Sequence, residues 1–172
     1  MNSSAAYDDL VRQFWVYSSQ GITLFLGNSL ILTTICYQRL LRESKEYMAM
    51  AALSTLYVFE GVALMSAGIG RLLLIRTNSA QKFVPLRLCL LMPWNIVWMF
   101  NGHTYEATLL IISIDRLIAV AWPLFHYGLD RRGTVKLILI GWAPGLVCSL
   151  WPIGWTLATN KYTNALCYTE VF

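Results

Sequence analysis

Long apolar runs constrain the fold of this chain more than any other feature of its sequence. The first run, Phe14–Tyr37, contains no charged residue and is long enough to cross a hydrocarbon layer of roughly 30 Å, which takes about 20 residues. Three more runs are mostly apolar: Tyr47–Leu74, Pro85–Val120 and Val135–Ala158. Only 13% of the residues are charged, against about 25% in soluble domains. The sequence therefore predicts an all-α membrane protein with four transmembrane helices.

The segments around these runs set the expected topology. Residues 1–13 form a polar N-terminal tail, residues 14–158 the transmembrane region, and residues 159–172 a polar loop after the last span. Lys and Arg divide almost evenly between the two sides, so they do not orient the chain. Asn2 begins an Asn-Ser-Ser glycosylation sequon, which favours an extracellular N-terminus. We therefore expect a multi-pass protein of the plasma membrane, with the tail and the last loop outside the cell.

Composition and cysteine spacing argue against several soluble functions. The net charge of +4 comes from basic residues scattered between the apolar runs, so we expect no nucleic-acid binding. The chain has two histidines and no nucleophile motif, so we expect no enzymatic activity. Its four cysteines show no Cys-x-x-Cys pair and no metal-ligand spacing, so we predict no metal site and no cofactor.

A charged pair, Asp115-Arg116, interrupts the stretch IISIDRLIAVAWP, which ends at Pro123. Isolated charges in hydrocarbon are costly, so we place the pair where the third span meets water. An arginine at such a boundary either extends its side chain to the interface for solvation or takes part in function.

This pair belongs to a wider pattern of residues at fitting intervals. Its members are, in chain order, Gly27-Asn28, Asp115-Arg116, Pro123, Trp142 and Pro152. Over its whole length the chain resembles the first four helices of a rhodopsin-like G-protein-coupled receptor. The stretch IDRLIAVAWP is also similar to nematode serpentine chemoreceptors of the Srsx type. The resemblance implies the N-terminal half of a seven-helix bundle, in which Asn28, Trp142 and Pro152 are structural residues.

The resemblance also implies functional roles. Cys89 and Cys167 would form a disulfide at the outer ends of the third and fourth spans. Asp115, Arg116 and Pro123 would couple to a heterotrimeric G protein: Arg116 would pair with Asp115 at rest and contact the G protein when the helices part. A small-molecule or peptide ligand would bind within the bundle, which membrane lipid surrounds.

The chain departs from the family pattern at several positions. Tyr57 and Glu60 stand where an Asp is usual, which puts the family's sodium site in doubt. Trp98 stands about where amine receptors carry the Asp that pairs with their ligand, which argues against an amine. Cys89 is about two residues further than usual from the Asp-Arg pair.

Three polar residues inside the apolar runs call for an explanation: Glu60, His103 and Glu106. Counted at 1.5 Å per residue, all three lie at a similar depth, about 15–20 Å from the inner ends of their spans. An acid at this depth is either a contact for an ion, proton or ligand, or a neutral or paired acid inside the bundle. The sequence leaves both interpretations open.

An aromatic and amide face runs along the outer part of the third span. It consists of Trp94, Trp98, Asn101 and Tyr105, which follow one another at helical spacing. Such a face suits an apolar pocket for a small odorant or a peptide side chain. Ordinary helix packing is the alternative. Gly141 and Gly145 form a G-x-x-x-G motif in the fourth span, which helix packing explains at least as well as dimerisation.

The hypothesis from sequence is a fragment of a G-protein-coupled receptor, with chemoreception as its expected role. It would bind ligand within the bundle and signal through the Asp-Arg pair. The alternative is a complete four-span protein, either a transporter that uses Glu60, His103 and Glu106 or a tetraspan scaffold.

Overall fold

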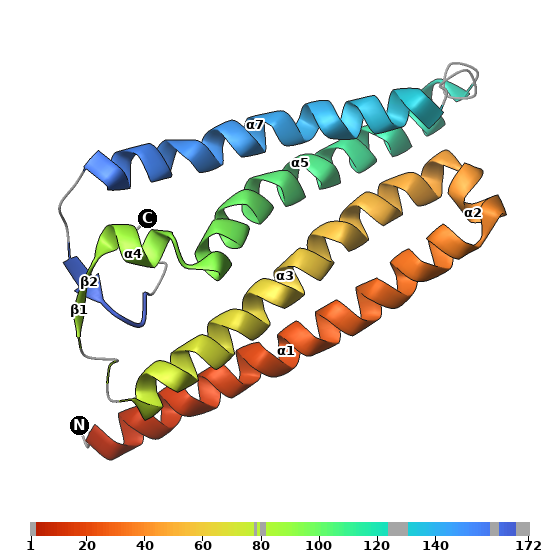
Figure 1. Cartoon of the computed structure of the whole chain (residues 1–172). Helices are drawn as coiled ribbons and strands as arrows, with labels where there is room; N and C mark the ends of the chain where they lie inside the picture. The colour runs from red at the N-terminus through yellow and green to blue at the C-terminus, as the bar shows by residue number, and fades with distance from the viewer. Residues whose placement is uncertain (1–2, 78, 80–81, 124–130, 159–161, 168–172) are drawn as a thin grey trace.

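The computed structural model describes residues 3–77, 79, 82–123, 131–158 and 162–167. In these ranges the chain is mostly helical, which confirms the all-α class. The long helices are α1 (Ser3–Tyr37), α3 (Lys45–Arg76), α5 (Pro93–Ala121) and α7 (Arg131–Ala158). The short elements are α2 (Arg39–Glu43), β1 (Phe83–Pro85), α4 (Leu86–Leu90) and β2 (Tyr162–Asn164). Figure 1 shows α3 between α1 and α5, with α7 on the far side of α5.

Within the described ranges, three helices are long and apolar enough to cross a membrane, through the segments Tyr7–Tyr37, Glu46–Arg76 and Gly133–Trp151. The chain is therefore a membrane protein, and three of the four predicted spans are supported. The remaining predicted span, α5, does not reach this apolar content. The first half of α5 carries polar residues such as Asn101 and His103, which lower its mean hydropathy.

The first helix is longer than the apolar run that predicted it. It begins at Ser3, not near Phe14, so most of the predicted polar tail is helical. At 1.5 Å per residue, its 35 residues measure about 52 Å, far more than a bilayer's roughly 30 Å hydrocarbon layer. Outside that layer, Asp9 and Arg12 pair at 3.1 Å on the exposed surface.

Small residues bring α1 and α3 into close contact along their length (Figure 1). A Cβ atom added to Gly61 would lie 2.7 Å from the backbone nitrogen of Phe25. One added to Gly68 would lie 2.7 Å from the carbonyl oxygen of Phe14. Larger residues would separate the backbones, so these glycines permit the close approach that stabilises helix pairs in lipid.

The third apolar run does not form the single helix that the sequence predicted. It divides into α4 and α5, separated by a turn at Leu91 and Met92, and α5 begins at Pro93. Proline has no backbone N–H and clashes with a preceding helical turn, so it favours the first turn of a helix. The turn lies between Cys89 and the Asp-Arg pair. In the sequence, the distance from Cys89 to this pair is about two residues longer than is usual in the family that the chain resembles.

A two-stranded sheet joins segments from either side of the two later helices. β1 pairs antiparallel with β2, with Val84 opposite Thr163. The backbone N–H of Ala165 extends the pairing by donating to the carbonyl of Lys82, at 3.0 Å. Figure 1 shows this sheet at the end of the bundle where α1 begins and α3 ends. The sequence predicted only a polar loop here.

The glycine motif of α7 packs against α5. A Cβ atom added to Gly145 would lie 2.8 Å from Thr104 Cγ2, and one added to Gly141 would meet the side chain of Ile111. Of the two interpretations left open, packing within the chain accounts for both glycines.

Candidate functional site

A polar cluster joins α3 and α5 near the middle of both helices. Asn101 is 4% exposed, and its Nδ2 donates to the carbonyl of Leu56 at 3.0 Å and to Glu60 Oε2 at 2.8 Å. Beside it, the hydroxyl groups of Tyr57 and Tyr105 share a hydrogen bond of 2.8 Å. Both contacts cross between helices, so the cluster sets how α3 and α5 face each other.

This cluster borders an open pocket of about 270 Å³ between α3 and α5. Its lining residues are Tyr57, Glu60, Asn101, Gly102 and Tyr105. Asn101 and Tyr105 are two of the four residues that the sequence assigned to a ligand pocket. Glu60, whose role the sequence left open, also lines this pocket and brings a carboxylate to it.

The two tryptophans of the predicted ligand face have other surroundings. Trp94 is buried against Ala63 and Ala67 of α3. Trp98 is half-buried, and its ring lies 5.7 Å from the guanidinium carbon of Arg71. Both tryptophans share the α3-facing side of α5 with Asn101, as predicted. For Trp94, helix packing is the interpretation that fits.

The structure does not bring His103 and Glu106 to Glu60. Both side chains are exposed, and neither lines the pocket. At about 100° per residue, they lie roughly 200° and 140° around α5 from Asn101, on the side away from α3. Equal depth along the helices does not show that side chains meet, because side chains at one depth can point in opposite directions.

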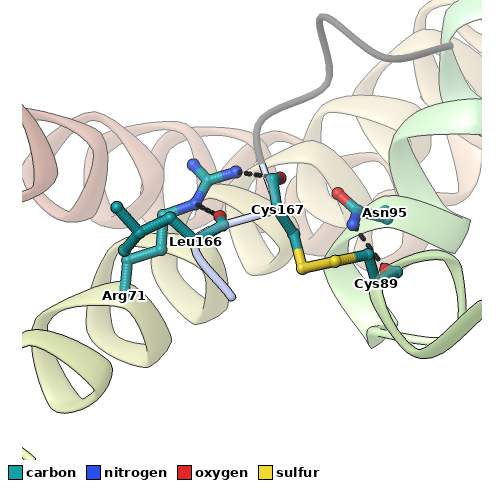
Figure 2. The surroundings of a disulfide bond; sticks show 5 residues. All are labelled: Arg71, Cys89, Asn95, Leu166 and Cys167. Atoms are coloured by element: carbon teal, nitrogen blue, oxygen red, sulfur yellow. Dashed lines mark hydrogen bonds between the residues drawn. A yellow bond between two sulfur atoms is a disulfide. The ribbon is translucent and has the colours of Figure 1, made fainter. Parts of the chain in front are cut away.

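At the end of the bundle where α5 begins, a disulfide joins Cys89 of α4 to Cys167, which follows β2. Their Cα atoms are 5.4 Å apart, and both residues are buried. Asn95 in the first turn of α5 donates through Nδ2 to the carbonyl of Cys89, at 2.6 Å (Figure 2). The disulfide is the pairing that the resemblance implied. It ties the segment after α7 to the segment before α5.

A buried arginine, Arg71, lies beside this disulfide, and sequence reasoning missed its role. It is 2% exposed and donates from Nε to the carbonyl of Leu166 at 3.0 Å and from Nη2 to that of Cys167 at 3.1 Å (Figure 2). Its guanidinium carbon also lies 5.7 Å from the ring of Phe14. The available signal was a lone cation inside an apolar run, which requires partners wherever it is buried.

At the end of the bundle opposite the disulfide, Arg116 pairs with Glu46, in the first turn of α3. The distance between Nη1 and Oε1 is 3.3 Å, and the two side chains are 57% and 50% exposed. Asp115 is half-buried, and Pro123 is exposed just after the end of α5. A predicted coupling residue thus has a partner on another helix that the sequence did not indicate.

The predicted structural residues occupy ordinary helical surroundings. Asn28 donates to the carbonyl of Leu24, one turn earlier, at 2.9 Å. Trp142 Nε1 donates to Thr108 Oγ1 at 2.8 Å, which links α7 to α5. Pro152 lies within α7. Asn2, the predicted glycosylation site, lies outside the described residues.

Among the described residues, no group of three or more His, Cys, Asp or Glu side chains could hold a metal ion. No protein-family model matches the chain, and no curated protein sequence matches it significantly. The functional argument therefore rests on the residues and their geometry.

Proposed function

We propose that this chain is the N-terminal part of a rhodopsin-like G-protein-coupled receptor with a role in chemoreception. In this proposal a ligand binds within the helix bundle, and Asp115, Arg116 and Pro123 couple the bundle to a heterotrimeric G protein. We propose further that the protein lies in the plasma membrane with its N-terminus and the disulfide outside the cell.

The observation that carries the proposal is the position of α5, which begins beside a disulfide and carries an exposed arginine near its other end. The Cys89–Cys167 disulfide lies beside the start of α5. Arg116 lies 23 residues after Pro93, about 35 Å along the helix at 1.5 Å per residue. In this proposal a single helix connects the two sides of the bilayer, with a fixed outer end and an exposed arginine at the inner end.

The contact at the inner end supports a mechanism of release. The Arg116–Glu46 pair is half-exposed, and such pairs contribute only about 0–1 kcal/mol because water competes for both charges. A small shift of α5 against α3 could therefore separate them. The freed guanidinium could then donate to a carbonyl or carboxylate of the G protein, which a planar group with five N–H donors does well.

Two measurements test the proposal. Sequencing of full-length transcripts from the locus should show residues 1–172 followed by three more apolar spans. In cells that make this longer protein, Arg116→Ala should reduce G-protein activation by about tenfold or more, the scale expected when one charged contact in a complex is lost. Arg39→Ala is the matched control, because Arg39 is also an exposed arginine paired with a glutamate near that end of the bundle.

The four-span alternative makes opposite predictions. Transcripts would end after four spans, and activation would be absent or would not depend on Arg116. Among the described residues, no contact favours a transporter that uses Glu60, His103 and Glu106 together, because of these three only Glu60 lines the pocket.

A further inference from the structure

One acceptor beside the pocket between α3 and α5 lacks a donor among the described residues. It is Asn101 Oδ1, which is buried from solvent and has no hydrogen-bond partner there. Its amide cannot simply rotate by 180°, because the carbonyl of Leu56 and the carboxylate of Glu60 both need the NH₂ group where it is. A buried acceptor without a donor is unfavourable, so the site as it stands is incomplete.

The carboxylate of Glu60 is incomplete in the same sense. It lies in the interior of α3, lines the pocket and accepts a hydrogen bond from Asn101. Among the ion pairs of the described residues, none involves Glu60. Acids inside a membrane are normally paired with a cation or a donor. No Lys or Arg is among the residues that line the pocket, so the cation must come from elsewhere.

The remaining walls are suited to an organic cation. The rings of Tyr57 and Tyr105 line the pocket, and aromatic faces attract ammonium groups. Their hydroxyls bond to each other, which leaves lone pairs available to a donor. The pocket's volume of about 270 Å³ lies just below the range of about 300–1,000 Å³ typical for drug-sized ligands. A ligand of this site must therefore be small.

We propose that this pocket binds a short alkylammonium ion, whose N–H groups donate to the Glu60 carboxylate and to the hydroxyl oxygens of Tyr57 and Tyr105. The proposal rests on the proposed function, since it names the class of ligand that the bundle recognises. Trp98 stands about where amine receptors carry their acid and does not line this pocket, but Glu60 supplies a carboxylate from α3. An amine is thus accommodated by a different helix.

The test measures binding to the purified chain, residues 1–172, in lipid nanodiscs. The probes are isobutylammonium, isobutanol as a neutral molecule of similar shape, and sodium ion, all at equal ionic strength. Millimolar isobutylammonium should raise the thermal midpoint by about 3 °C or more, because a ligand that binds only the folded state stabilises it. Isobutanol and sodium should have no such effect.

Variants assign the effect to the pocket. Glu60→Gln should weaken isobutylammonium binding by about tenfold or more, since it removes the charge and keeps the shape. Tyr105→Phe should weaken it by a few-fold. Glu106→Gln is the matched control and should leave binding unchanged, because Glu106 is an exposed glutamate of α5 outside the pocket.

Three results would overturn the proposal: equal stabilisation by isobutanol, equal stabilisation by sodium, or binding that survives Glu60→Gln. If Glu60→Gln fails to fold, the three probes on the unmodified chain still decide. The assay contains no G protein. Binding without activation that depends on Arg116 would therefore contradict the proposed function alone, and the reverse would contradict this inference alone.

Discussion

Two arginines at opposite ends of the bundle have contrasting environments. Arg71, near the C-terminal end of α3 and beside the disulfide, is 2% exposed, donates to two backbone carbonyls and lies close to the rings of Phe14 and Trp98. Arg116, near the C-terminal end of α5, is more than half exposed and pairs with one exposed glutamate. An arginine thus fixes the structure at one end of the bundle, whereas at the other end an arginine can change partners.

The two arginines differ in their access to water. A buried guanidinium has no water to replace a lost partner, so every broken contact costs its full desolvation penalty. An exposed guanidinium exchanges a carboxylate for water at little cost. The end of the bundle with the disulfide is therefore suited to fixed geometry, and the end with Arg116 is suited to switching. Four measurements test this contrast, from the largest expected effect to the smallest.

The first is Arg71→Ala, which should lower the free energy of unfolding by about 3–5 kcal/mol. Two buried carbonyls lose their donor, at about 1–3 kcal/mol each, and a cavity forms between two aromatic rings. Denaturant titration in mixed micelles measures the change. Arg76→Ala, in the exposed last turn of the same helix, is the control and should cost less than about 0.5 kcal/mol. Equal effects of the two variants would remove the contrast.

The second is the double variant Cys89→Ser with Cys167→Ser. The disulfide closes a loop between residues 78 apart in the sequence, and its loss should cost about 2–4 kcal/mol, mainly because the unfolded chain gains freedom. The same titration with and without reductant should show the difference in the unmodified chain. Cys148→Ser, which removes a free exposed cysteine, should change nothing under either condition.

The third concerns the middle of the bundle, where Trp142 donates to Thr108. Trp142→Phe should cost about 1 kcal/mol for the lost hydrogen bond, in addition to the smaller loss of ring area. Combination with Thr108→Val in a double-mutant cycle isolates the bond itself. A coupling energy near zero would show that the two side chains stabilise the bundle independently.

The fourth is the cycle of Arg116→Gln with Glu46→Gln. The coupling energy should be no more than about 1 kcal/mol and should shrink as salt rises, because both charges are exposed. Stability measured at low and high ionic strength checks both points. A coupling as large as the cost of Arg71→Ala would mean that the end with Arg116 is held as firmly as the end with the disulfide.

Several features of the fold were predictable from the sequence because they depend on composition and local chemistry. The apolar runs located the four long helices, since only a helix satisfies all its backbone groups in lipid. The face from Trp94 to Tyr105 was correctly placed on one side of α5, because helical periodicity depends only on spacing. The cysteine pairing came from the resemblance and needed no geometry.

Other features depended on how the helices pack, which no local pattern contains. His103 and Glu106 shared a depth with Glu60 but lie away from α3, because rotation about the helix axis is set by packing. Arg71 became buried only because the segment after β2 returns across the end of α3. The Glu46 partner of Arg116 likewise required the relative positions of α3 and α5.

The sequence by itself thus determined the membrane environment and the helical class, since both follow from hydrophobicity and backbone chemistry acting along each apolar run. It did not predict the break before Pro93, which the structure shows. Only the tertiary structure decided which polar side chains meet: Glu60 with Asn101, Tyr57 with Tyr105, and Arg71 with the returning loop. These contacts join residues more than 40 positions apart, so their energies depend on a geometry that exists only after the helices have packed.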